Sequence, residues 1–175
     1  MINFLTVGSQ QSVEAAFRAA GWTGVDRNPE DAALHVVLAS IGKRTYTEMP
    51  MSYLYLFGRV QDYGFARAKP IEVIMYRHHL RLWKAPFELN SRAVWLGAAT
   101  HDIGLEGDER DGSITHKIDP KVDNERDFVA ETFRASGTAS AMTLVLPNHP
   151  VFHARTATGG SFSSDGQLLI IVLAR

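Results

Sequence analysis

Two long runs of β-type residues, 72–83 and 92–106, constrain the fold of this chain most. They read EVIMYRHHLRLW and RAVWLGAATHDIGLE, and both are rich in aromatic and β-branched side chains. Only a short segment with a proline separates them. Runs of this length and composition are typical of central strands, so we expect the two segments to be neighbouring strands of one sheet.

Helix signals precede and follow this β-rich middle. Residues 9–20 are expected to form a helix that Ser9 or Ser12 caps and that ends before Gly21. A second helix is expected at 29–41, and a third is expected to begin after Asp119, with a proline at its first position. Further strands are expected at these segments: 2–8, 53–59, 63–68, 113–118, 141–147 and 167–175.

The order of these elements predicts an α+β fold with a mixed or antiparallel sheet and about three helices. A chain of 175 residues suits one hydrophobic core, and the sequence shows no repeat or linker. We therefore expect residues 1–175 to form a single domain.

Composition excludes several classes of protein. The formal net charge is −1, so no overall positive field favours nucleic acid as a partner. There are no cysteines, which excludes disulfides and thiolate metal sites. No apolar run approaches the ~20 residues that a membrane helix needs, and the N-terminal segment is not typical of a signal peptide. The chain is therefore expected to be a cytoplasmic, soluble protein.

The segment YRHHLRLW contains two adjacent histidines between two arginines. Side chains alternate along a strand, so one face is expected to carry Arg77, His79, Arg81 and Trp83. This face is interpreted in two ways. It is either an ordinary solvated surface, as for most charged strand residues, or a cationic site for a ligand.

Charged residues are also expected within apolar surroundings. Asp102 ends an apolar run and needs a partner there. Arg126 lies on the apolar stripe of the third helix, so we expect it to be buried and paired with Asp102 or Asp62. Asp123 is explained by its place in the first turn of that helix. These four residues are expected to support a site or an internal salt-bridge network.

A metal site is a possible alternative. Seven residues have side chains that bind divalent metals and together could supply three or four ligands: His78, His79, His101, His116, Asp102, Asp119 and Asp123. The set expected for a hydrolase is His79, Asp102 and His116. Their positions are far apart in the sequence, so spacing alone does not favour this site.

The chain resembles the LssY C-terminal domain family in four segments that occur in order: SYLYLFGRVQDYGF, RHHLRLW, AVWLGAATHDIGLE and HKIDPKVDNERD. The similarity extends to the opening and closing segments. In that family the domain is often fused to membrane segments similar to type 2 phosphatidic acid phosphatases or DedA-like proteins. Carried over by position, the polar signature of the family falls on these residues: Gly58, Arg59, Gln61, Asp62, Arg77, His79, Arg81, Trp83, Asp102, His116, Asp119, Asp123, Glu125 and Arg126.

The chain departs from this resemblance at two positions. Lys117 stands where the family tends to have a second histidine, and His101 stands where it often has an aromatic residue. Both departures argue against a metal site of the family that uses these two positions.

The resemblance names no reaction, so whether the chain is an enzyme stays open. We expect an accessory module that binds a small anionic or phosphorylated ligand, such as a lipid headgroup, through Arg59, Arg77, His79, Arg81 and Trp83. No cofactor is then needed, and a membrane protein is a further possible partner by analogy. The alternatives are a metal-dependent hydrolase of phosphate esters and a purely structural domain. Protonation of His79 would strengthen anion binding but weaken metal binding.

Overall fold

The computed structural model describes residues 1–25, 53–67, 76–110, 112, 114–156 and 159–174. The helix expected at 29–41 lies outside these residues. Within them the structure has two helices, α1 (Gln10–Ala19) and α3 (Val122–Ser136).

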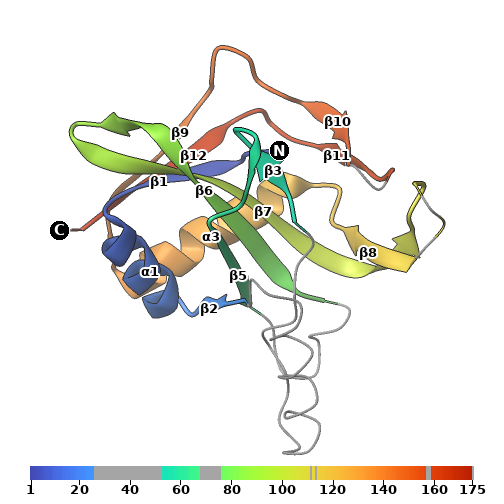
Figure 1. Cartoon of the computed structure of the whole chain (residues 1–175), viewed down its shortest axis with the longest axis horizontal. Helices are drawn as coiled ribbons and strands as arrows, with labels where there is room; N and C mark the ends of the chain where they lie inside the picture. Colours follow the sequence, from blue (N-terminus) through green and yellow to red (C-terminus); the bar gives the residue numbers. More distant parts are fainter. Residues whose placement is uncertain (26–52, 68–75, 111, 113, 157–158, 175) are drawn as a thin grey trace, which may run out of the picture.

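The architecture is a mixed sheet with helices packed against it (Figure 1). Eight strands form the sheet: β1 (Phe4–Val7), β2 (Thr23–Gly24), β5 (Tyr63–Arg67), β6 (His78–Leu89), β7 (Arg92–Gly107), β8 (Ile114–Ile118), β9 (Ala139–Val145) and β12 (Leu168–Leu173). Their order is β2-β5-β6-β7-β1-β12-β9, and β8 pairs with β7 beside this path. β1 runs parallel to β12, and each of the other pairings described in this sheet is antiparallel. The expected mixed sheet is confirmed.

Two small hairpins accompany the main sheet. One pairs β3 (Tyr55–Leu56) with β4 (Arg59–Val60), and the other pairs β10 (His153–Arg155) with β11 (Ser161–Ser163). The β10–β11 hairpin lies within the long glycine- and serine-rich connection between β9 and β12.

The hairpin of β6 and β7 is the centre of the molecule. The two strands are antiparallel neighbours over most of their length, which confirms the pairing expected from their composition. The chain reverses at Asn90 and Ser91, both with positive φ, as a tight hairpin turn requires. β7 then continues beyond β6 and pairs with β8. β7 therefore connects the centre of the sheet to β8, which lies beside the main order of strands.

The two helices begin and end at recognisable signals. The side chain of Ser9 accepts a hydrogen bond from the amide of Ser12, so Ser9 is the N-cap of α1. α3 ends at Gly137, whose left-handed backbone is easily adopted by glycine. Its start differs from the expected one, because α3 begins at Val122. Asp119 instead accepts from the Lys121 amide at 2.8 Å and stabilises the preceding turn.

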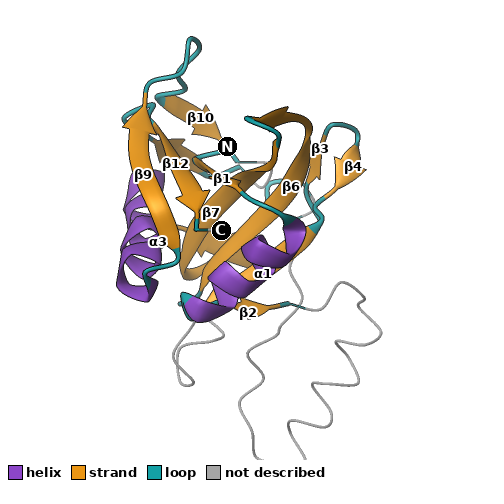
Figure 2. Ribbon diagram, turned by 90° about the vertical axis from the view of Figure 1, so that its left-hand side faces the viewer, coloured by secondary structure: helices purple, strands orange, loops and turns teal. Residues whose placement is uncertain are grey.

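The main hydrophobic core lies between the sheet and both helices, which are drawn in purple in Figure 2. It includes Phe17 from α1, Phe133 from α3 and Leu80 from β6, each fully buried. Even-numbered residues at the start of β6 thus face the helices, and odd-numbered residues face away from them. A smaller apolar cluster of Val7, Ala85 and Val94 lies on the opposite face. In the part of the chain that is described, no helix is long and apolar enough to cross a membrane.

Candidate functional site

A buried polar group lies on the face of the sheet that points away from the helices. It consists of side chains from three strands: Arg77 just before β6, His79 and Arg81 in β6, Asp102 in β7, and His116 in β8. We call this group the Asp102 cluster. Strand alternation places the β6 members on one face, as expected, and the pairing of β6, β7 and β8 brings Asp102 and His116 beside them.

Asp102 is the acceptor of the cluster and is only 1% exposed. Its Oδ1 accepts a hydrogen bond from His79 Nε2 at 2.8 Å. Its Oδ2 lies 3.5 Å from His116 Nδ1 and 3.7 Å from Arg77 Nε. Burial alone would raise the pKa of Asp102, but the bond from His79 and the nearby charges hold this pKa below its ordinary value. Asp102 is therefore ionised at neutral pH.

His79 has a defined tautomer in this arrangement. Arg81 Nη1 lies 3.4 Å from His79 Nδ1, and a guanidinium can only donate. Nδ1 of His79 must therefore accept, and Nε2 carries the proton that is donated to Asp102. Burial lowers the pKa of His79, and the contact with Asp102 opposes this effect only in part. His79 is thus a neutral imidazole between a guanidinium and a carboxylate.

The two arginines are buried as well, at 4% and 6% exposure for Arg77 and Arg81. The interpretation of this strand face as an ordinary solvated surface is therefore wrong. Burial lowers the pKa of Arg77 and lowers the pKa of Arg81 to about 10, and Asp102 opposes both shifts. Two desolvated cations around one carboxylate make this region electrostatically favourable for an anion.

Asp102 Oδ2 and His116 Nδ1 are among the atoms of the cluster that are buried without a hydrogen bond from any residue that the structure describes. Their separation of 3.5 Å is long for a hydrogen bond between them. Unsatisfied buried polar atoms are rare in folded proteins and often mark the place of a ligand, ion or water. These two atoms therefore identify the position within the cluster where a small polar group would fit.

Trp83 and Arg59 were expected to line the same site, but Trp83 lies further along β6 and Arg59 lies in β4. Trp83 is 2% exposed, and its indole Nε1 also has no hydrogen-bond partner among the described residues. Arg59 donates to Asp62 and to the backbone carbonyl of Lys84, three residues beyond Arg81. Asp62 in turn accepts from the Lys84 amide. These contacts connect the β4–β5 segment to β6, so we do not include Arg59 and Asp62 in the Asp102 cluster.

Arg126 is buried at 2% exposure, as expected, but its expected partners are wrong. Its guanidinium pairs with Asp165 at 2.7 Å, with Asp127 at 2.8 Å and with Asp123 at 3.3 Å, not with Asp102 or Asp62. Burial alone would lower the pKa of Arg126, but its bonds to Asp165 and Asp127 raise it. The reason for the error is position: Arg126 lies at the α3 edge that faces the segment after β11, whereas Asp102 faces away from the helices.

Asp123 connects the same two segments. Its carboxylate accepts from the hydroxyl of Ser164 at 2.8 Å and from the amide of Asp165 at 2.6 Å. The first-turn aspartate of α3 therefore does more than favour the helix terminus: it holds the segment that precedes β12.

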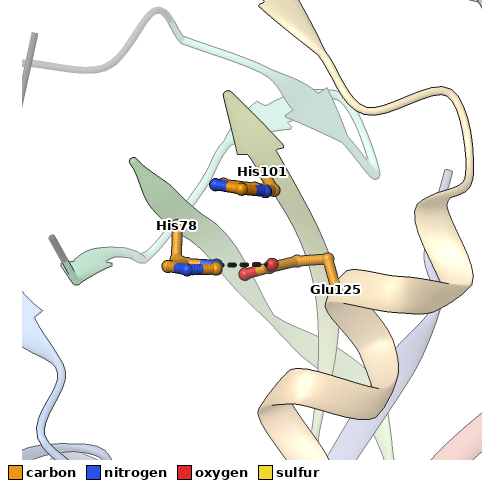
Figure 3. A group of neighbouring side chains, drawn as sticks. All are labelled: His78, His101 and Glu125. Atoms are coloured by element: carbon orange, nitrogen blue, oxygen red, sulfur yellow. Dashed lines mark hydrogen bonds and ion pairs between the residues drawn. The ribbon is translucent and has the colours of Figure 1, made fainter. Parts of the chain in front are cut away.

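A second polar group lies on the helix-facing side of β6 and β7 (Figure 3). Sequence reasoning named His78 and His101 among the candidate metal ligands but did not group them with Glu125. His78 and His101 are paired across the two strands, and their rings stack at 4.2 Å. Glu125 of α3 accepts from His78 Nδ1 at 2.7 Å. The group could be predicted only from the β6–β7 register, which places His78 opposite His101. The amino-acid composition of the two strands does not determine this register.

Fold and site together define a class: a mixed α/β domain whose central hairpin carries a buried arginine–histidine–aspartate cluster on one face. The sequence model described as LssY C-terminus matches residues 1–168, so the chain belongs to that family. No curated protein matches the chain. No solved structure matches it either.

Proposed function

We propose that this domain binds a small phosphorylated ligand at the Asp102 cluster. The observation that carries the proposal is the burial of Asp102 Oδ2 beside the Arg77 guanidinium, whose Nε lies at 3.7 Å, and the His116 imidazole, whose Nδ1 lies at 3.5 Å. Guanidinium groups donate to anionic oxygens with charge-assisted hydrogen bonds. The carboxylate instead needs a donor.

A hydrogen-phosphate group supplies acceptors for the guanidiniums and a donor for the carboxylate. Its ionised oxygens accept from Arg77, Arg81 and the imidazole of His116, and its P–OH donates to Asp102. Sulfate carries no proton at neutral pH and would place an ionised oxygen against the carboxylate. The cluster therefore favours hydrogen phosphate, or a phosphate monoester bound as its protonated monoanion, over sulfate, because two like charges in contact repel strongly at a buried site.

The electrostatics of the cluster support the same ligand. Burial lowers the pKa values of both guanidiniums, so each charge is costly in the folded protein. A bound phosphate would offset that cost. Since burial also lowers the pKa of His79, we expect its protonation to strengthen binding only at a pH below the ordinary histidine value. A lipid headgroup and a soluble phosphate ester share this chemistry.

Calorimetric titration of the purified chain with inorganic phosphate, glycerol 3-phosphate and sulfate at neutral pH tests the proposal. Phosphate and glycerol 3-phosphate should bind, and sulfate at least tenfold more weakly. Arg81→Ala should weaken phosphate binding about tenfold or more, since a hydrogen bond to a charged group contributes about 1.5–3 kcal/mol. Arg81→Lys keeps the positive charge but loses the two parallel N–H donors of the guanidinium, so it should bind phosphate with intermediate affinity.

Arg134→Ala is the matched control, because Arg134 is exposed in the last turn of α3. It should bind phosphate like the parent. Absence of heat with either phosphate compound, together with a lower melting temperature for the Arg81 variants, would contradict the proposal and favour a structural salt-bridge network. Equal binding of sulfate would show that Asp102 does not face the ligand.

A metal-dependent hydrolase is the second candidate. It is supported by the convergence of His79 and His116 on the two oxygens of Asp102, at 2.8 Å and 3.5 Å. It ranks second because the Arg77 guanidinium lies beside the same carboxylate and repels a cation. Zinc binding that His116→Asn abolishes would favour the hydrolase.

A further inference from the structure

The second polar group lies under α3, across the sheet from the Asp102 cluster. It consists of His78 from β6, His101 from β7 and Glu125 from α3 (Figure 3). One potential ligand atom of each residue lies within 4.8 Å of those of the other two. We propose that these three residues bind a divalent transition metal ion such as Zn²⁺. This inference is independent of phosphate binding at the Asp102 cluster.

The donor set suits such an ion. Two imidazoles and one carboxylate are typical protein ligands of zinc, and a fourth position then stays open for water or another ligand. The three donors come from three elements that are fixed relative to one another. His78 and His101 are direct partners across the β6–β7 hairpin, and Val129, one turn after Glu125, is fully buried in the main core. The backbone therefore holds the three side chains together.

The Glu125 carboxylate gives the second, independent indication. Its side chain is 2% exposed, and only Oε2 has a hydrogen bond, from His78. Oε1 is buried without a hydrogen-bond partner in the described part of the chain. A half-satisfied buried carboxylate is costly. An ion bound beside it would give the carboxylate a cationic partner and remove this cost.

The negative charges near Glu125 also favour a bound cation. Burial raises the pKa of Glu125, the bond from His78 opposes this, and the negative charges of Asp102 and Asp119 raise it further. Burial disfavours any unpaired charge at Glu125, but the negative charges of Asp102 and Asp119 specifically favour a cation there. The local field therefore attracts a metal ion.

The imidazole rings must move for an ion to bind. They are almost parallel, with an angle of 8° between planes 4.2 Å apart at their centres. A metal ion lies close to the plane of each imidazole that binds it, so parallel stacked rings do not share one ion. His78 is held on its other side by Phe128, at 4.0 Å, and by its bond to Glu125. We therefore assign the rotation to the ring of His101.

Titration of the purified chain with Zn²⁺, followed by calorimetry and melting temperature, tests the site. The visible absorption of bound Co²⁺ reports whether nitrogen and oxygen donors surround the ion. His101→Phe keeps an aromatic ring to stack on His78 but removes a donor, and Glu125→Gln keeps the hydrogen bond but removes the charge. Both variants should bind Zn²⁺ at least tenfold more weakly than the parent and lose the Zn²⁺-dependent rise in melting temperature.

Two controls make the outcome decisive. His153→Phe removes an exposed histidine of β10 and should bind Zn²⁺ like the parent. His116→Asn removes a donor of the Asp102 cluster and should also retain binding. If the parent binds no Zn²⁺, or if His101→Phe binds as tightly as the parent, the inference is wrong. Loss of binding in His116→Asn alone would place the ion on the other face and also overturn it.

Discussion

The Asp102 carboxylate is buried beside the guanidiniums of Arg77 and Arg81, and it is the negative charge that stabilises both of them. We predict that Asp102→Asn lowers the free energy of unfolding by roughly 3–5 kcal/mol at neutral pH, because it leaves buried cations without their anion. Denaturant unfolding measures this loss. Glu131→Gln, at an exposed position of α3, is the control and should unfold like the parent.

The pH dependence of this difference has a definite sign. The pKa of Asp102 is lowered in the folded protein, so its stabilising contribution is fully present above the unfolded value of about 3.9. It is lost as the pH falls through the lower, folded value. The parent and Asp102→Asn should therefore differ most at pH 7 and progressively less below about pH 4. Equal unfolding midpoints at pH 7 would contradict the role assigned to this carboxylate.

The alternation of side chains along a strand predicts which residues share a face, but it does not predict whether that face is buried. The shared face of Arg77, His79 and Arg81 followed from their odd numbering alone, and the structure places them together. Their burial did not follow, because a strand pattern does not tell which other segments cover its faces. His116 illustrates the same limit: its approach to Asp102 depends on the pairing of β7 with β8.

At the scale of elements, the β6–β7 hairpin was predictable but its register was not. Leu89 pairs with Arg92 beside the turn, and continuing that register would place His78 opposite Ile103. The irregularity between Lys84 and Glu88 shifts the pairing, so His78 lies opposite His101. A bulge of this kind has no clear sequence signal. The His78–His101–Glu125 group was therefore missed, although its three residues are all visible in the sequence.

Arg126 and Asp123 of α3 both bind the segment before β12. Arg126→Ala removes its bonds to Asp165 and to the backbone carbonyl of Gln167. We expect a loss of roughly 1.5–3 kcal/mol in the free energy of unfolding, less than for a fully buried pair because Asp165 is 39% exposed and can be hydrated.

Thermal and denaturant unfolding of Arg126→Ala measure this loss, with Arg134→Ala on the same helix as the control. Faster amide exchange at residues 164–167 should accompany the loss, since these residues lose their anchor. An unchanged melting temperature would show that Asp123 alone holds this segment. Asp165 was not predicted as the partner, because it lies in a long connection whose path follows from the tertiary structure.

At the scale of the whole molecule, β7 is shared by both polar groups and by the main core. Gly97 of β7 pairs with Phe4 of β1, and a Cβ at Gly97 would come within 2.1 Å of the Phe4 ring. Phe4 is fully buried and contacts Phe17 of α1, with ring centres 6.3 Å apart. The absence of a side chain at Gly97 therefore leaves the space that the Phe4 ring occupies.

Gly97→Ala should thus destabilise the fold, even though alanine normally suits a strand better than glycine. The Phe4 ring must shift within a closely packed core, and overpacking of this kind costs typically about 1–3 kcal/mol. Gly107→Ala is the matched control on the same strand, because a Cβ there meets no atom within 4 Å. Denaturant unfolding should give a lower midpoint for Gly97→Ala and an unchanged or higher one for Gly107→Ala. Equal midpoints for the two variants would mean that the Phe4 ring moves aside without cost, and that the core between β1, β7 and α1 is looser than its packing indicates.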